Sequence, residues 1–223
     1  MASMTPVDRS AADRIPQDGE DAAVEARILN AAAHLIADEG FGRLKIGAVC
    51  ARSGYARSVI FQHFGDKDGL GQRLVEYAVE EFTTAYSEAV AARTGSATAT
   101  PMDMLRALLD IIFELIRTMP TLNQAFLACW GDAAAEYSAL RGALTEADRR
   151  FRFAIAQTLA SGVADGSITG VRDADAYAGA LLAQLRGISM QALIDPDGVD
   201  LRGVRAELER GIDRLSAGFR GSL

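Results

Sequence analysis

Three features of the sequence predict an all-α fold. Apolar residues recur at intervals of three and four over most of the chain, and no stretch alternates clearly between apolar and polar residues, which favours helix over strand. Alanine, leucine and arginine, which have high helix propensity, dominate the same stretches. Prolines and glycines divide the chain into segments of helical length. With 223 residues, 49% of them hydrophobic, the chain can bury a sizeable core.

The N-terminal part is predicted to be a tail followed by one helix. Residues 1–22 hold two of the five prolines and show no periodic pattern, so we expect a flexible tail there. From Ala23 to Glu39 apolar residues recur at helical spacing, and Gly40 follows directly. A first helix is therefore expected over 23–39.

Residues 44–70 are the most informative part of the sequence. They predict two short helices joined by a turn, with the start of a long third helix directly after them. Gly54 lies where the first short helix must end, because glycine readily adopts the left-handed conformation that ends helices. This order of elements is typical of a helix-turn-helix DNA-binding motif. The non-apolar residues of the second helix are left for the side that a DNA groove would meet: Arg57, Ser58, Gln62 and His63.

The charge of the chain is unevenly distributed. The net charge is −7, yet residues 43–73 hold six Lys and Arg against two Asp, so this segment carries +4 and the remainder −11. Screening limits electrostatic attraction to about 10 Å at ordinary salt. A small basic segment on an acidic body can therefore still bind DNA.

A long helix and several further helices are predicted after the motif. Asp66 is expected to cap a helix that runs to about Arg93, roughly 40 Å at 1.5 Å per residue. Such a helix is long enough to join a DNA-binding head to a separate body. After a loop at 94–101, helices are expected over these ranges: 102–118, 122–130, 137–164, 173–194 and 201–215.

The N-terminal residues resemble the signature of the TetR/AcrR family of bacterial transcriptional regulators. The motifs cover residues 24–75, and the rest of the chain resembles the family in helical pattern only. The matching stretches are Ile28–Ala32, Glu39–Phe41, Ser53–Tyr55, Phe61–Phe64 and Lys67. The resemblance implies a dimeric, all-α repressor that responds to a ligand. Its helix-turn-helix DNA-binding domain (23–70) would be joined by the long helix to a helical ligand-binding and dimerisation domain (71–223).

The resemblance also implies which residues contact double-stranded operator DNA. The predicted contacts are Lys45, Arg57, Ser58, Val59, Phe61, Gln62, His63 and Lys67. Arg57 can pair bidentately with guanine and Gln62 with adenine. Lys45, His63 and Lys67 match positions that face phosphates in the family. For Arg57, Gln62 and Lys67 the alternative is that the side chains are simply solvated at the surface.

Three residues depart from the family pattern. The family usually has Ser or Thr where Ala56 stands, so the second helix of the motif lacks a side-chain N-cap, a loss of roughly 1 kcal/mol. It usually has Tyr at Phe61 and Thr at Lys45. These departures motivate an alternative function, in which a helical dimer with a degraded DNA head acts through a protein partner. Salt dependence separates the two, because DNA binding weakens steeply as salt rises.

The body is predicted to bind a small apolar or amphipathic effector. Aromatic residues are scarce, yet Phe113, Phe126 and Trp130 fall within eighteen residues, in the region where the family builds its ligand cavity. With Leu109 and Met190 they are the predicted ligand-binding residues. The alternative is a filled core, since aromatic stripes usually pack in cores.

The two C-terminal helices resemble the pair through which the family forms homodimers. The helix over 173–194 is apolar almost all round, and such a helix must be covered on two sides. A partner copy could supply one of the two covers. The alternative is that both helices close the core of the monomer.

The sequence contains no motif that indicates another class of function. The sequence contains no GxGxxG, GxxxxGK, GxSxG or HExxH, and only two histidines, so we expect no enzyme, cofactor or metal. Cys50 and Cys129 have no CxxC spacing and are expected to be buried packing residues, with a redox-sensing thiol at Cys50 as the alternative. Neither a signal peptide nor a membrane span is evident, which predicts a cytoplasmic protein without a membrane partner.

Overall fold

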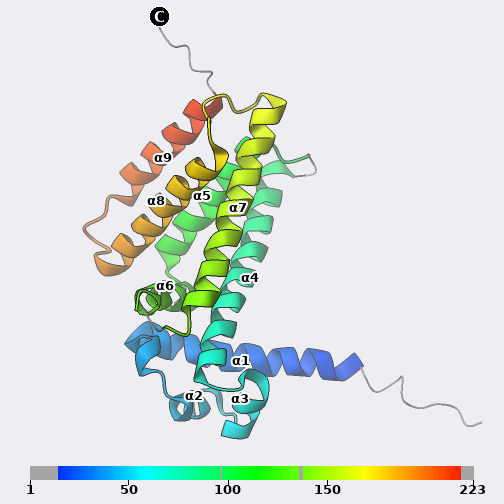
Figure 1. Ribbon diagram of the computed structural model, residues 1–223, viewed down its shortest axis with the longest axis vertical. Helices are drawn as coiled ribbons and strands as arrows, with labels where there is room; N and C mark the ends of the chain where they lie inside the picture. The colour runs from blue at the N-terminus through cyan, green and yellow to red at the C-terminus, as the bar shows by residue number, and fades with distance from the viewer. Residues whose placement is uncertain (1–14, 96, 136–137, 217–223) are drawn as a thin grey trace, which may run out of the picture.

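The computed structural model describes residues 15–95, 97–135 and 138–216 (Figure 1). All regular elements in these ranges are helical, which confirms the predicted all-α class. The elements, in chain order, are α1 (Ile15–Glu39), η1 (Phe41–Arg43), α2 (Ile46–Ser53), α3 (Arg57–Phe64), α4 (Lys67–Thr94), α5 (Pro101–Thr118), α6 (Thr121–Ala133), α7 (Arg141–Asp165), α8 (Ala174–Ile194) and α9 (Leu201–Ser216).

The first helix begins at Ile15, so the prediction of a tail reaching to residue 22 was wrong for residues 15–22. Pro16 misled it. Proline is the second residue of α1, where its missing N–H costs little because the first four N–H groups of a helix have no partner within it. Residues 1–14, the rest of the predicted tail, lie outside the described residues.

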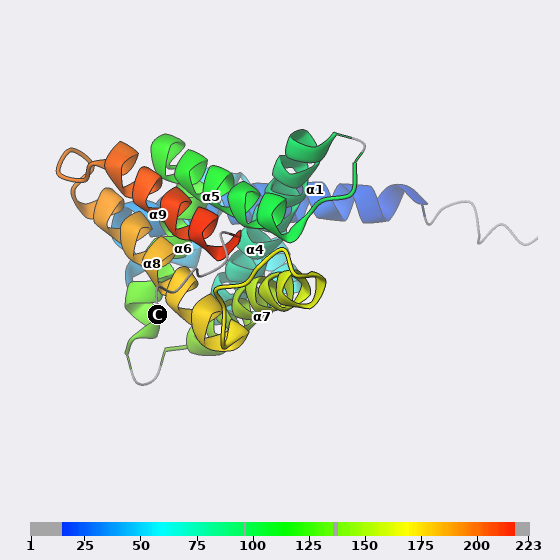
Figure 2. The same cartoon turned by 90° about the horizontal axis from the view of Figure 1, so that it is seen from above.

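The head lies at one end of the molecule and the body extends from it along α4. In Figure 1, α1 crosses the lower end, α2 and α3 lie below it, and α4 rises from the head into the body. Helix α6 lies between the two parts and packs on α1. From above, α8 and α9 lie side by side on the flank away from α4 (Figure 2). No helix of the described residues has the length and apolar composition needed to cross a membrane.

Two apolar cores hold the fold together. The head core contains residues of α1 to α4, but also Ala125 and Cys129 of α6 and Leu144 of α7. The body core is formed by α5, α7, α8 and α9. Helix α6 and the start of α7 therefore belong to the head by packing, although they follow the long connecting helix in sequence.

Polar side chains set the starts of the longer helices. The Asp66 carboxylate accepts the N–H of Gly69 at 2.8 Å and caps α4, as predicted. Thr100 and Asp103 form a reciprocal capping box at α5, and hydrogen bonds from Thr100 lower the pKa of Asp103. Asp173 caps α8 through the N–H of Ala176. Each cap satisfies backbone donors that the helix leaves free.

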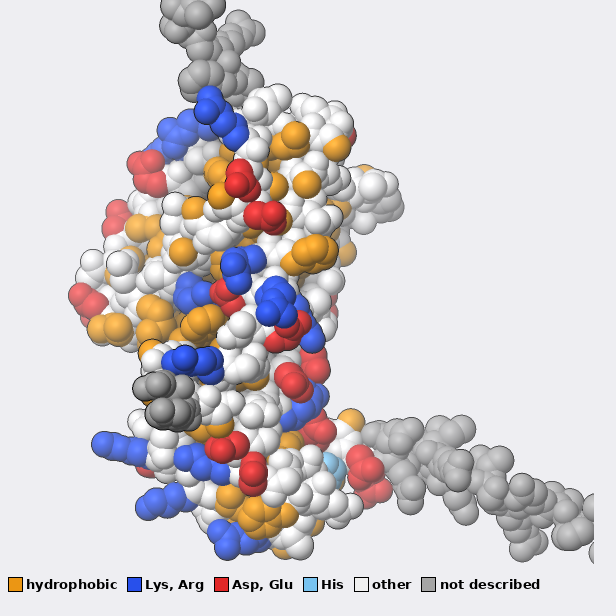
Figure 3. Space-filling view, in the orientation of Figure 1, with side chains coloured by type: hydrophobic (Ala, Val, Ile, Leu, Met, Phe, Trp, Pro, Cys, Tyr) orange, Lys and Arg blue, Asp and Glu red, His pale blue; other side chains and the backbone are white. Residues whose placement is uncertain are grey.

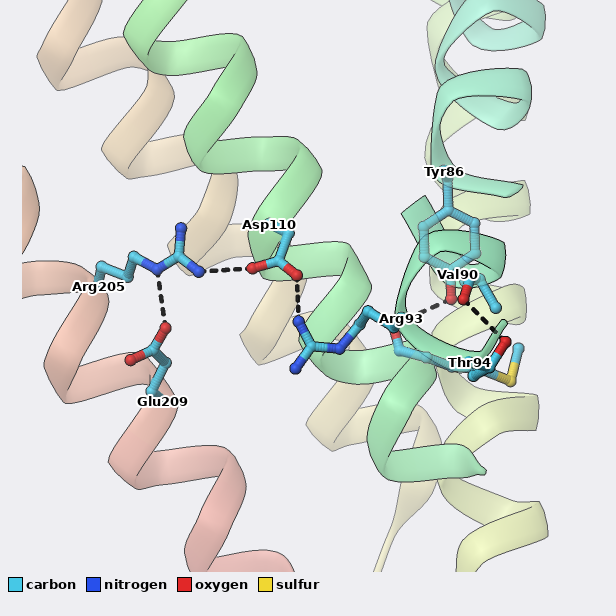
Figure 4. A network of polar contacts seen from close by, with 8 residues as sticks. Tyr86, Val90, Arg93, Thr94, Asp110, Arg205 and Glu209 are labelled. Carbon is cyan, nitrogen blue, oxygen red and sulfur yellow. Dashed lines mark hydrogen bonds and ion pairs between the residues drawn. The ribbon is translucent and has the colours of Figure 1, made fainter. Parts of the chain in front are cut away.

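A chain of ion pairs joins α4, α5 and α9 in the body (Figure 4). Asp110 of α5 pairs with Arg93 of α4 and, at 2.5 Å, with Arg205 of α9. Arg205 also pairs with Glu209 at 2.8 Å. Hydrogen bonding to Glu209 and then to Asp110, outweighing the effect of burial, raises the pKa of Arg205. The network connects the helix that leaves the head with the last helix of the chain.

We predict that Gly71→Ala destabilises the protein. A Cβ at this buried position of α4 would lie 2.3 Å from Phe41 Cε2 and 2.9 Å from Leu140 Cδ2, so η1 and the start of α7 would have to shift. We expect the free energy of unfolding, measured by urea denaturation, to fall by ~1–3 kcal/mol, as for other overpacked cores.

The matched control is Gly131→Ala in α6, where a Cβ meets no atom within 4 Å. This variant should be unchanged or more stable by up to about 1 kcal/mol, since alanine favours helix. A Gly71→Ala protein as stable as the parent would show that α4 and η1 pack less closely than these distances indicate.

Candidate functional site

The turn between α2 and α3 is built as the sequence predicts. Gly54 has a φ of 80°, in the left-handed region, and its N–H donates to the Cys50 carbonyl at 2.9 Å. The Ser53 hydroxyl accepts the N–H of Tyr55 at 3.3 Å. Ala56 precedes α3 and makes no side-chain cap. The angle between the two short helices is thus set by backbone conformation and by packing, and α3 begins without a capping side chain.

Helix α3 presents a polar face on the outside of the head. Arg57, Ser58 and Gln62 are exposed, as required for groove contacts. Phe61 is 41% exposed, and the Arg57 Cζ atom lies 5.6 Å from the centre of its ring. On the opposite side, Ile60 and Phe64 are buried in the head core.

Two predicted contacts on α3 are less accessible than expected. Val59 is half-buried and packs against the head core, so only part of its side chain is available to a groove. His63 is also half-buried, with its ring centre 5.9 Å from that of Phe64. Their roles in DNA binding remain predictions.

The two predicted phosphate-facing lysines differ in their surroundings. Lys45 precedes α2 and is exposed. Lys67 is half-buried: its ammonium donates to the Gly42 carbonyl at 2.9 Å and lies 4.7 Å from the centre of the Phe41 ring. Lys67 therefore also fastens η1 to the start of α4.

Further basic residues surround the motif and were not among the predicted contacts. Arg43 and Arg52 are exposed, and Figure 3 shows Lys and Arg side chains around the lower end of the molecule. The Arg27 Cζ atom of α1 lies 5.4 Å from the centre of the Tyr55 ring. Local charge could have pointed to Arg43 and Arg52. No local pattern links Arg27 to the turn, because only the fold brings α1 there.

Helix α6 contacts the head through polar groups as well as apolar ones. The Asp132 carboxylate accepts the N–H of Phe41, the first residue of η1, at 2.9 Å. The Gln124 amide donates to the Ala37 carbonyl of α1 at 3.5 Å. A change in the position of α6 would therefore be felt directly at η1 and α1.

The five predicted effector-binding residues do not share one core. Leu109 is buried in the body core, and Phe113 is buried beneath the Arg205 guanidinium, 5.6 Å from its ring centre. Phe126 and Trp130 of α6 pack against the head core, with their rings edge to face and 6.5 Å between ring centres. Met190 of α8 is half-buried. The structure thus brings Phe126 and Trp130 together and assigns Leu109 to a different cluster.

Trp130 has a partner that the sequence did not reveal. The Arg186 Cζ atom of α8 lies 3.8 Å from the centre of the Trp130 ring, and the Arg186 guanidinium donates to Asp148 of α7 at 2.8 Å. The Trp130 Nε1–H is buried and has no acceptor among the described residues. These residues lie on three helices, so no spacing in the sequence could have connected them.

The flank formed by α8 and α9 carries an apolar groove of about 350 Å³. It is lined by Gly187, Ile188 and Gln191 of α8 and by Val204 and Leu208 of α9. The groove lies on the outer flank of the body.

A helix-turn-helix head, a long connecting helix and a helical body define the general architecture of a bacterial transcriptional regulator. Residues 28–74 match the model for bacterial regulatory proteins of the tetR family, and residues 101–217 match the model for the C-terminal domain of BetI-type transcriptional repressors. The chain belongs to the TetR family and has a C-terminal domain of the BetI type. This is a family of transcription regulators, and the predicted alternative of a degraded head acting through a protein partner is not favoured.

Individual relatives are distant. The HTH-type transcriptional regulator BetI 1 of Chromohalobacter salexigens is 27% identical over 116 residues, which are 52% of this chain and 55% of that protein. The chain spans about half the length of the curated relatives it matches.

Solved structures agree with the fold over most of the chain. A TetR-family transcriptional regulator from Rhodococcus sp. has a TM-score of 0.74 and 23% identity, covering 87% of this chain and 99% of its own. A transcriptional regulator from Saccharomonospora viridis in complex with choline has a TM-score of 0.66 and 24% identity, covering 86% and 96%.

We predict that the two cysteines react very differently in the native protein. Burial, and then the charge of Asp132, raise the pKa of the Cys129 thiol to about 12. At pH 8 roughly one thiol in ten thousand would then be ionised, and the thiolate is the reactive form. A thiol-specific reagent such as Ellman's should therefore titrate about one thiol, the half-buried Cys50, and two after denaturation.

The control is Cys50→Ser, which should show almost no rapid reaction until it is denatured. Rapid native labelling of Cys50→Ser would mean that α6 opens readily and that Cys129 is not sealed in the head core.

Proposed function

We propose that this protein is a homodimeric transcriptional repressor that binds operator DNA through α3 and is released when a small molecule binds its helical body. The observation that carries the proposal is the polar, exposed face of α3 in a TetR-family protein, with Arg57, Ser58 and Gln62 at the outer end of the head. Because such a regulator acts on chromosomal DNA, we also propose that it works in the cytoplasm.

The chemistry of α3 supports base reading. A helix in the major groove reads bases through long side chains with paired donors and acceptors. Arg57 offers a guanidinium for guanine, and Gln62 an amide for adenine. Lys45 and the exposed Arg43 and Arg52 would hold the head on phosphates, which fix the register without reading sequence.

The outer face of α8 supports dimerisation. Ala180, Ala183 and Gly187 are exposed small residues, and Ile194 at the end of the helix is 76% exposed. Together with the groove between α8 and α9 they form an apolar face that a second copy could cover. A two-fold dimer would place two heads on half-sites separated by about one helical turn of DNA or a multiple of it.

The position of α6 supports ligand control. A ligand changes DNA affinity only if it binds one conformation better than another, and α6 joins the predicted ligand residues Phe126 and Trp130 to the hydrogen bond between Asp132 and Phe41. The choline complex of the distant Saccharomonospora viridis regulator supports a small-molecule effector for a protein of this fold.

The DNA-binding proposal is tested with one arginine variant and one lysine variant of the head. We expect Arg57→Ala to weaken binding to the operator by ~1–3 kcal/mol, the contribution of a bidentate base contact, with little effect on random DNA. We expect Lys45→Ala to weaken both DNAs alike and to reduce the slope of log affinity against log salt by about one. Lys45 is the better phosphate test, because Lys67 also bonds Gly42.

The measurement is fluorescence anisotropy over a salt series, with the operator recovered by sequencing genomic fragments that the protein retains. Equal losses on both DNAs for Arg57→Ala would remove this residue from base reading. Binding of the parent that ignores salt would overturn the proposal of a DNA-binding regulator.

Dimerisation is tested with two matched variants, in each of which an exposed alanine is replaced by arginine. Ala183→Arg places a charge on the exposed face of α8, and Ala160→Arg places one on the exposed face of α7. Burying an unpaired charge in an interface costs several kcal/mol, so we expect sedimentation velocity to show monomers for Ala183→Arg and dimers for Ala160→Arg. Dimers of unchanged affinity for both variants would exclude this face of α8 as the interface.

A further inference from the structure

The space around Trp130 holds more hydrogen-bond donors than acceptors. The Nε1–H of Trp130 is buried and has no acceptor among the described residues. The Arg186 side chain is only 23% exposed, and the hydrogen bond it makes within the described part of the chain runs from Nη1 to Asp148. Its Nε and Nη2 groups are left for another acceptor. A buried donor without an acceptor is costly, so this arrangement favours a ligand that supplies acceptor atoms.

The guanidinium of Arg186 also occupies a place that a cationic ligand would need. Cations bind over the face of tryptophan within about 6 Å of the ring centre, and Arg186 Cζ is already there at 3.8 Å. A quaternary ammonium group on this face of the ring would have to displace Arg186 and take over its ion pair with Asp148. The structure thus disfavours a cation at the very position where tryptophan would bind one.

The ion-paired cluster beside Trp130 has an excess of positive charge, which favours an anion. Asp148 pairs with Arg186 at 2.8 Å and with Arg152 at 2.7 Å, so one carboxylate is shared by two guanidinium groups. A second carboxylate would balance this cluster. Arginine is suited to the role because its planar N–H groups match both oxygens of a carboxylate.

Each donor has an apolar side chain one helical turn away on its own helix. Phe126 precedes Trp130 by four residues on α6, and Met190 follows Arg186 by four residues on α8, so each pair shares one face of its helix. Phe126 and Met190 are both half-buried, and α6 contacts α8. An apolar chain attached to the carboxylate would find both side chains within reach.

We infer that the effector is an amphipathic carboxylate, whose acidic group binds the Arg186 guanidinium and the Trp130 Nε1–H between α6 and α8. The inference rests on the proposed function, because it identifies the chemical class of the effector in that proposal. It assigns Arg186 as the residue that selects an anion over a cation.

The test compares three probes with the same eight-carbon chain: octanoate, 1-octanol and octyltrimethylammonium, each below its micelle-forming concentration. Trp130 is the only tryptophan, so its emission reports binding in the full-length parent without DNA. We expect saturable change with octanoate and affinity weaker by at least about tenfold for the other two, as for the loss of charge-assisted hydrogen bonds. Tighter binding of octyltrimethylammonium, or no binding of octanoate, overturns the inference.

Two variants test the residue itself. Arg186→Leu removes the charge, frees the ring face and leaves Asp148 paired with Arg152 alone, so we expect octanoate affinity to fall and octyltrimethylammonium affinity to rise. Arg186→Lys keeps the charge but loses the planar guanidinium, so we expect it to keep part of the octanoate affinity. This variant also provides a test if Arg186→Leu does not fold. An unchanged order of probe affinities in the folded variants overturns the role of Arg186.

The proposed function is tested separately by adding octanoate to the complex of the protein with its operator. Release of DNA by octanoate supports both proposals. Failure to bind DNA at all contradicts the repressor and leaves the emission titration as an independent measure of the carboxylate site.

Discussion

Helix α6 packs along α1 and completes the core on which the DNA-binding head is built. Ala125 and Cys129 are fully buried in that core, and the Asp132 carboxylate accepts a hydrogen bond from the first N–H of η1. A hydrogen bond to a charged group contributes on the order of 1.5–3 kcal/mol. The head therefore depends for its stability on a helix that follows the long connecting helix in sequence. Trp130 packs against the same core and precedes Asp132 by only two residues on α6.

The departures in the head gain a physical interpretation from the structure. Neither α2 nor α3 has a side-chain N-cap, and each has only eight residues, too few to be stable alone. Their stability must come from packing, through Val49 and Ile60, which are both fully buried. Phe61 offers no hydroxyl for a phosphate, but its ring lies beside Arg57. Packing in the head core, rather than side-chain caps, therefore orients α3.

Much of the fold could be predicted from local pattern, because periodicity and capping residues act over a few positions. Gly54 and Asp66 were predicted to end α2 and to cap α4, and they do so in the structure. Local pattern failed at Pro16, where a residue that breaks helix interiors is tolerated in the first turn. Helical spacing alone also did not show how far the Val59 side chain turns toward the head core. The stacking of Arg186 on Trp130 could not be predicted, since it depends on how α6 and α8 pack.

Electrostatics separates the arginines of the body from those of the head. Many body arginines form ion pairs within their own helix, such as Arg117 with Glu114 and Arg149 with Glu146. Such exposed pairs contribute little to stability, but they neutralise the positive charge locally. In the described part of the head, Arg43, Lys45, Arg52 and Arg57 make no ion pair. Their positive charge is not neutralised by a neighbouring carboxylate, so it remains available to attract DNA phosphates. The pairing of charges, rather than the net charge of −7, explains how an acidic protein can present a surface that attracts DNA.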